Sequence, residues 1–161
     1  MAGSLYLVPT PIGNLGDISP RMSDALAQAD FIAAEDTRVS IKLLNHLDIK
    51  KSMVTYHRHN CDSSGPAILE RILAGETCAL VTDAGMPAIS DPGEELVALC
   101  AQNEVKVECI PGACALVTAL AVSGVSAGAM LSMIFLLISS KFAKQEYKAR
   151  QNRNANNKIT G

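Results

Sequence analysis

The longest segment of this chain that has the composition of a ligand-binding loop is DAGMPAISDPG, at residues 83–93. A connection between a strand and a helix usually has about two to six residues, so this segment is longer than a plain turn requires. Gly85 allows the backbone to approach a ligand closely, while Pro87 and Pro92 stiffen its path. The segment therefore favours a site built from backbone amides and carbonyls rather than from charged side chains.

Titratable side chains gather in two further segments, EDTR at residues 35–38 and HRHN at residues 57–60. The acidic pair of the first segment is equally suited to cap a following helix or to bind a hydroxyl-rich ligand beside its arginine. In the second segment His57 and His59 alternate around Arg58, so both rings point to one side of an extended backbone. No third ligand follows at a suitable spacing, and we predict no metal. Ordinary loop histidines, proton transfer and RNA contact stay open as interpretations.

A fourth segment, PTPIGNLGD at residues 9–17, follows a short apolar run near the start of the chain. It lacks the GxxxxGK[ST] pattern of a nucleotide-phosphate loop, and its glycines are spaced as Gly13-x-x-Gly16, which matches GxGxxG poorly. As a phosphate loop it is weak. A wall of another ligand site and a simple tight turn are the two remaining interpretations.

The elements that must position these segments are indicated by short apolar runs alternating with helical patterns. Cap-and-proline pairs at Ser19-Pro20 and Asp91-Pro92 begin the first and fourth helical patterns, and Gly75 ends the third. This alternation predicts an α/β fold: a doubly wound, mostly parallel five-stranded sheet with flanking helices. Ligands bind outside the carboxyl ends of such strands, so we expect the quoted segments to meet at one edge. The expected strands are Leu5–Val8, Phe31–Ala34, Met53–Tyr56, Cys78–Thr82 and Val105–Ile110.

Composition agrees with one globular domain, because 161 residues with 48% hydrophobic content can form a core. The net charge of -2 gives no general basic field for nucleic acid. Residues 129–161 nevertheless carry a net charge of +5, against -7 for the rest. The five cysteines include no CxxC pair and predict free thiols in a reducing cytoplasm. Three of them, Cys78, Cys100 and Cys109, lie in apolar segments and are expected to be buried.

Taken in order, the motifs resemble the N-terminal domain of ribosomal RNA ribose 2′-O-methyltransferases of the tetrapyrrole methylase (class III) superfamily. The resemblance runs from residue 4 to about residue 126. It implies S-adenosylmethionine as methyl donor, held between this domain and a second α/β domain in a cytoplasmic homodimer. The implied substrate is a cytidine ribose in the decoding region of 16S rRNA, in the small ribosomal subunit. The motifs are TPIGNLGDIS, AAEDTR, TYHRHN, VTDAGMPAISDPG and IPGACALVTALAVSG.

The resemblance also suggests roles for residues of the matching motifs. The residues expected to bind the donor are Pro11, Gly13, Asp83, Ala84, Gly85, Pro87, Pro111, Gly112 and Ala113. The residues expected nearest the acceptor are Glu35, Asp36, Thr37, Arg38, His57 and Asn60. Removal of the hydroxyl proton calls for a base, and our first hypothesis is His57 because histidine titrates near the working pH. Asp36 is the second.

Residues 127–161 depart from the pattern and form an atypical apolar and basic tail, which we interpret as a truncation or frameshift product. We therefore predict two parts, residues 1–126 as the methylase-like domain and residues 127–161 as the tail. We expect the chain alone to be weakly active or inactive, and to aggregate through Met130–Ile138.

Three alternatives stay open. One is a methylase with a tetrapyrrole-like substrate, and another is a non-catalytic nucleotide-binding α/β module. The third is a fragment tethered to a membrane by residues 115–138, because residues 110–140 carry no charge. We favour a buried helix there and expect no stable membrane association.

Overall fold

The computed structural model describes residues 2–128, 130–132 and 136. It divides into two compact units, Met1–Ala115 and Leu116–Gly161, which are considered one at a time. The boundary between these units falls before the expected one at residue 126. Most of the predicted tail, including residues 137–161, lies outside the described residues.

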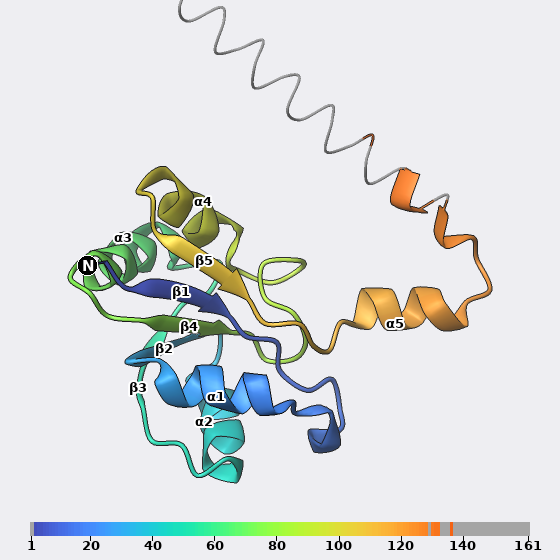
Figure 1. Cartoon of the computed structure of the whole chain (residues 1–161), viewed down its shortest axis with the longest axis horizontal. Coiled ribbons are helices and arrows are strands. Elements are labelled where there is room, and N and C mark those ends of the chain that lie inside the picture. Colours follow the sequence, from blue (N-terminus) through green and yellow to red (C-terminus); the bar gives the residue numbers. More distant parts are fainter. Residues whose placement is uncertain (1, 129, 133–135, 137–161) are drawn as a thin grey trace, which may run out of the picture. The chain divides into compact units, whose positions relative to one another are not determined.

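The first unit contains a five-stranded sheet in the order β3-β2-β4-β1-β5, and every neighbouring pair is parallel (Figure 1). The predicted doubly wound α/β sheet is thus confirmed, and each apolar run lies within one residue of a strand. The strands are β1 Ser4–Leu7, β2 Phe31–Ala34, β3 Ser52–Thr55, β4 Cys78–Val81 and β5 Lys106–Cys109.

Helices cover both faces of this sheet (Figure 1). α1 (Pro20–Gln28) and α2 (Thr37–His46) pack on one face, where Leu26 and Leu44 are buried against Ile32. α3 (Cys61–Leu73) and α4 (Glu94–Gln102) pack on the other, with Ile72 and Leu96 buried. A 3₁₀ turn, η1 (Leu15–Asp17), lies between β1 and α1.

Side-chain alternation along the central strands explains why two cores form. Leu5 and Leu7 of β1 join the core under α3 and α4, whereas the intervening Tyr6 packs at the core under α1 and α2. β2 and β4, in the interior of the sheet, are buried at every position. Their near-continuous apolar runs are typical of parallel strands covered on both faces.

The edge strand β5 corrects one prediction from the sequence. Cys78 and Cys100 are buried as expected, and burial raises the pKa of the Cys100 thiol to about 11. Cys109, however, is exposed. Among the described residues β5 pairs only with β1, so its end has a strand neighbour on one side alone, and an apolar pattern does not distinguish such an edge from the interior.

The start of α1 and the end of α3 lie where the sequence predicts them, whereas α4 begins later than predicted. The Ser19 hydroxyl accepts a hydrogen bond from the Met22 amide at 3.2 Å, and Pro20 is the first helical residue. The Asp91-Pro92 pair has the same cap-and-proline form, yet α4 begins only at Glu94. The loop between β4 and α4, which contains residues 83–93 and is called the fourth loop below, therefore keeps its whole expected length.

α5 (Ala115–Val122) begins at the last residue of the first unit and otherwise lies in the second unit. It is an apolar helix with no buried residue, so the expectation of a buried helix in this segment is wrong. The sequence predicts a helix from Ala113 to about Val122, and α5 covers the later part of that segment. Within the part of the chain that the structure describes, no helix has both the length and the hydropathy needed to cross a membrane.

Candidate functional site

The loops that follow β1 and β4 are joined by backbone hydrogen bonds. The Thr10 amide donates to the Gly85 carbonyl at 2.9 Å, and the Gly85 amide donates back to the Thr10 carbonyl at 2.9 Å. The buried Thr10 hydroxyl also donates to the Thr82 carbonyl at 3.0 Å. These bonds form a small antiparallel bridge at the carboxyl edge of the sheet, so the first and fourth loops build one continuous wall.

The loop after β5 packs against the same wall. A Cβ added at Gly112 would lie 2.5 Å from Cγ of Pro9, so only glycine permits this approach. Gly85 has a φ of +88°, and a Cβ there would lie 3.3 Å from Cγ2 of Ile12 and 3.8 Å from the Ala113 carbonyl oxygen. Three of the five strand ends therefore meet, as the sequence predicts.

The structure separates the predicted donor residues by exposure. Gly13, Asp83, Ala84, Pro111 and Gly112 are exposed at the edge, whereas Gly85 and Pro87 are buried. Pro11 and Ala113 are partly buried. The exposed members are the ones that a ligand can reach directly, and the buried ones shape the loop beneath them.

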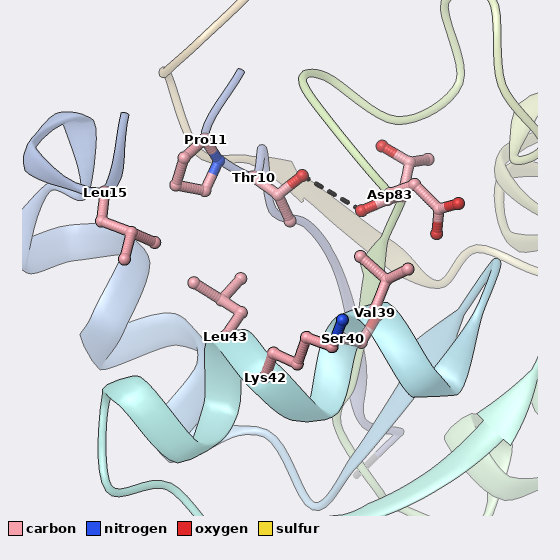
Figure 2. A pocket seen from close by; sticks show the side chains of 9 residues that line it. Thr10, Pro11, Leu15, Val39, Ser40, Lys42, Leu43 and Asp83 are labelled. Atoms are coloured by element: carbon pink, nitrogen blue, oxygen red, sulfur yellow. Dashed lines mark hydrogen bonds between the residues drawn. The ribbon is translucent and has the colours of Figure 1, made fainter. Parts of the chain in front are cut away.

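A cavity of about 230 Å³ opens between the first loop and α2 (Figure 2). Its walls are mainly apolar and come from Pro11 and Leu15 on one side and from Val39 and Leu43 on the other. Asp83 lies at its border, after the end of β4. Figure 2 shows Leu15, Pro11 and Leu43 around one space, although they belong to two different elements.

The acidic pair after β2 divides into two different environments. The Asp36 carboxylate caps α2 by accepting a hydrogen bond from the Arg38 amide at 2.8 Å. It also forms an ion pair with the Arg38 guanidinium at 2.6 Å. These contacts lower the pKa of Asp36 to about 2. Thr37 is the first residue of the helix. The helix-capping interpretation from the sequence therefore applies to Asp36, whose lone pairs are already engaged.

Glu35 is partly buried and faces other carboxylates. Its pKa is raised, first by burial and then by the negative charges of Asp91 and Asp83. A hydrogen bond from the Asp83 backbone and the charge of Arg58 act in the opposite direction. The Glu35 carboxylate therefore interacts electrostatically with Asp83 and Asp91, which lie near the two ends of the fourth loop.

The loop after β3 is held by its own asparagine. The Asn60 side chain accepts from the His57 amide at 2.7 Å and donates to the Thr55 carbonyl at 3.0 Å, which closes a turn around the two histidines. The His57 and His59 ring centroids lie 6.0 Å apart at an interplanar angle of 63°. Nδ1 of His57 is buried and has no hydrogen-bond partner among the described residues.

Two residues of the site were not among the candidates from the sequence. The Arg58 guanidinium donates to the Ser90 carbonyl and so ties the third loop to the fourth. Ser40 of α2 lines the cavity and is buried, with a hydroxyl that has no partner among the described residues. The central position of Arg58 in HRHN was a usable signal, whereas nothing in the local sequence distinguishes Ser40 from a surface serine.

These residues fit a donor with a cationic sulfonium. The wall presents an exposed carboxylate at Asp83, which is compatible with a positively charged ligand. For the region that the structure describes, no cluster of three or more His, Cys, Asp or Glu side chains is arranged to hold a metal ion.

Comparison with known proteins gives one family and a consistent set of relatives. A family model described as tetrapyrrole (corrin/porphyrin) methylases matches residues 4–158, which extends past the limit near residue 126 that the motifs suggest. A protein named ribosomal RNA small subunit methyltransferase I from Halalkalibacterium halodurans is 50% identical over 143 residues, which are 89% of this chain and 50% of that one. The namesake from Synechocystis is 52% identical over 124 residues, or 77% of this chain and 44% of its own. The chain spans about half the length of these curated relatives.

Solved structures support the fold. A uroporphyrin III C-methyl transferase from Thermus thermophilus matches with a TM-score of 0.57 at 20% identity, over 73% of this chain and 52% of that chain. A conserved hypothetical protein from Aeropyrum pernix gives a TM-score of 0.56 at 22% identity, over 70% and 40%. At this level of identity the likeness concerns the fold alone.

Proposed function

The chain belongs to the tetrapyrrole (corrin/porphyrin) methylase family, and we propose that it is the N-terminal part of an S-adenosylmethionine-dependent methyltransferase of small-subunit ribosomal RNA. The observation that carries the proposal is the joint wall of the first, fourth and fifth loops, linked at Thr10, Gly85 and Gly112. The names of relatives about half identical to this chain support RNA as the substrate. The finer assignment that we propose is the 2′-hydroxyl of a cytidine in the decoding region of 16S rRNA.

The donor residues act by position. We propose that Gly13, Asp83, Ala84 and Gly112 contact the methyl donor directly, while Gly85 fixes the path of the loop beneath it. Bound S-adenosylmethionine would supply an activated methyl group to an oxygen nucleophile. A carbonyl-rich wall suits a sulfonium because carbonyl oxygens carry partial negative charge. Holding two reactants in a productive geometry is the main contribution a protein makes to such a transfer.

On the acceptor side, we propose that Glu35, Thr37, Arg38 and Asn60 lie nearest the RNA. The Arg38 side chain is 88% exposed, so its outer face is accessible to a ribose or phosphate oxygen even while it pairs with Asp36. His57 remains the first choice for the base, since its Nδ1 has no hydrogen-bond partner among the described residues. Asp36 is a weaker choice because Arg38 stabilises its ionised form.

The proposal covers the whole protein, of which this chain corresponds to about half. We propose that a second α/β domain supplies the opposite wall of the donor cleft and that the complete protein works as a homodimer in the cytoplasm. Sedimentation of a chain with the full length of its relatives measures this, and a monomer at micromolar concentration contradicts the dimer.

Calorimetric titration with S-adenosylmethionine, NAD and ATP tests the donor. We expect binding of S-adenosylmethionine alone, and weaker binding after Gly85→Ala because a side chain at φ +88° would distort the joint wall. Gly75→Ala is the matched control, since Gly75 has a φ of +108° just after α3 and belongs to none of the loops that form the joint wall. Equal loss of affinity in both variants, or preference for NAD or ATP, would overturn the proposal.

A further inference from the structure

The cavity between the first loop and α2 has a size and a lining that suit one flat group. Its volume of about 230 Å³ is below the roughly 300–1,000 Å³ of sites that enclose a whole drug-sized ligand. Apolar side chains form opposite walls, Pro11 and Leu15 facing Val39 and Leu43 across the space in Figure 2. Such walls hold a planar group by its faces.

Ser40 supplies an independent observation. Its side chain lines this cavity, the residue is only 3% exposed, and its hydroxyl has no hydrogen-bond partner within the described residues. Burying a hydroxyl without a partner costs free energy, and an alanine would avoid that cost. A hydroxyl both donates and accepts, so a ligand with a carbonyl or an amino group at its edge would satisfy it.

The charges around the cavity indicate what else the ligand carries. Lys42 lines the cavity from α2, one helical turn after the exposed Arg38, so two cations follow each other along this side of the helix. The Asp83 carboxylate also borders the cavity, so a phosphate attached to the planar group would lie on the α2 side, beside Lys42. The residues of α2 that line the cavity follow directly after the EDTR segment, which ends in the first turn of that helix.

We propose that this cavity receives a single unstacked base of the acceptor RNA, with Ser40 hydrogen-bonded to its edge and Lys42 near its phosphate. The inference rests on the proposed function, because it assigns a subsite to the RNA substrate. Single-stranded RNA is recognised in this way elsewhere, by splayed bases held between side chains and read at their edges.

The test fills the cavity from one side. Val39→Phe places a larger side chain on the wall, and Ile41→Phe is the matched control, since both residues are β-branched and partly exposed on α2 but Ile41 does not line the cavity. The probe is a fluorescently labelled, cytidine-containing single-stranded RNA of ten nucleotides, with S-adenosylmethionine titrated in parallel. We expect Val39→Phe to weaken RNA binding about tenfold, the scale of one lost base contact, with donor affinity unchanged. Ile41→Phe should change neither.

Two further variants separate a binding role from a structural one. Ser40→Ala should weaken RNA binding several-fold without lowering the melting temperature, because the hydroxyl it removes has no partner in the fold. Lys42→Ala should reduce the slope of log affinity against log salt by about one.

Each other outcome has a defined meaning. Loss of donor affinity with RNA binding intact in Val39→Phe would assign the cavity to the donor and overturn the inference. Equal RNA binding in both phenylalanine variants, or no RNA binding by the unsubstituted chain, would also overturn it. RNA binding that is sensitive to Val39→Phe in a chain that does not bind S-adenosylmethionine would support the cavity assignment and contradict the donor assignment.

Discussion

At the scale of single residues, neighbours in sequence have opposite ionisation behaviour. The pKa of Asp36 is lowered by Arg38, whereas the pKa of Glu35 is raised by burial and by the charges of Asp91 and Asp83. The two carboxylates are identical in chemistry, so the difference comes entirely from what surrounds each of them. Charges placed where they are disfavoured are common at functional sites, and the raised pKa of Glu35 is consistent with the proposal that this residue lies near the acceptor.

Replacing Glu35 by glutamine should stabilise the fold at neutral pH. A raised pKa means that the contribution of this residue to stability is complete below its ordinary value of 4.5 and is lost as pH rises through the folded value. We therefore expect Glu35→Gln to increase the melting temperature at pH 7.5, with a gain that disappears near pH 4. Circular dichroism measures both. Glu70→Gln, on the exposed side of α3, is the control, and a lower melting temperature for Glu35→Gln at pH 7.5 would contradict the argument.

His57→Ala tests the proposed base in a chain of the full length of the relatives. We expect turnover to fall about 10²-fold or more at saturating RNA, with S-adenosylmethionine affinity retained, because general-base catalysis contributes on this scale. Methyl transfer and calorimetry on the same preparation give the two quantities. Unchanged turnover would end the assignment, and His46→Ala, at the end of α2, serves as the control.

At the scale of elements, the sequence predicts what is local and misses what depends on partners. The strands come from apolar runs with turn residues at their ends, and Ser19-Pro20 is a complete local signal for the start of a helix. The same kind of signal at Asp91-Pro92 was misleading, because Gly93 has a non-helical φ of +145° and α4 begins only at Glu94. The sequence predicts that the loops after β1 and β4 meet at one edge of the sheet. The bridge between Thr10 and Gly85, the Arg58 contact with Ser90 and the unpartnered Ser40 hydroxyl could be seen only in the packed structure.

The cap of α1 should contribute measurably to stability. Ser19→Ala removes the side-chain acceptor of the Met22 amide and leaves only the Ser19 carbonyl, so it should lower the free energy of unfolding by about 1 kcal/mol, whereas Ser19→Asn should preserve most of it. Urea denaturation measures these differences. Ser23→Ala, inside the same helix, is expected to be neutral or slightly stabilising because alanine favours helices. A similar loss for Ser23→Ala would show that the effect is not due to the cap.

At the scale of the whole molecule, the chain carries one complete α/β sheet and an apolar helix without a buried residue. It corresponds to about half of its curated relatives. We expect the 161-residue chain by itself to transfer methyl groups far more slowly than a chain of the relatives' length, because half of the proposed donor cleft would be absent. Robust methylation of small ribosomal subunits by the short chain would contradict this.

Self-association should depend on α5. Val117 and Val122 are 59% and 83% exposed, and exposed apolar surface of this kind favours aggregation. Val122→Lys should therefore reduce concentration-dependent light scattering, whereas Leu73→Lys, on α3, should have little effect. The neighbouring segment Met130–Ile138, predicted to aggregate from its sequence, lies largely outside the described residues. Equal scattering from Val122→Lys and the unsubstituted chain would remove α5 as the cause.

The parallel pairing of β1 also sets an order of events during synthesis. In the described part of the chain β1 pairs only with β4 and β5, and the acceptor of the Thr10 hydroxyl lies 72 residues later in the sequence. At 5–20 residues per second a ribosome needs roughly 4 to 14 s to add that length. Throughout this interval the first strand, although translated first, has no neighbour to pair with. The ligand wall is consequently a late product of translation, and its earliest residues depend on the nascent chain staying unaggregated until β4 emerges.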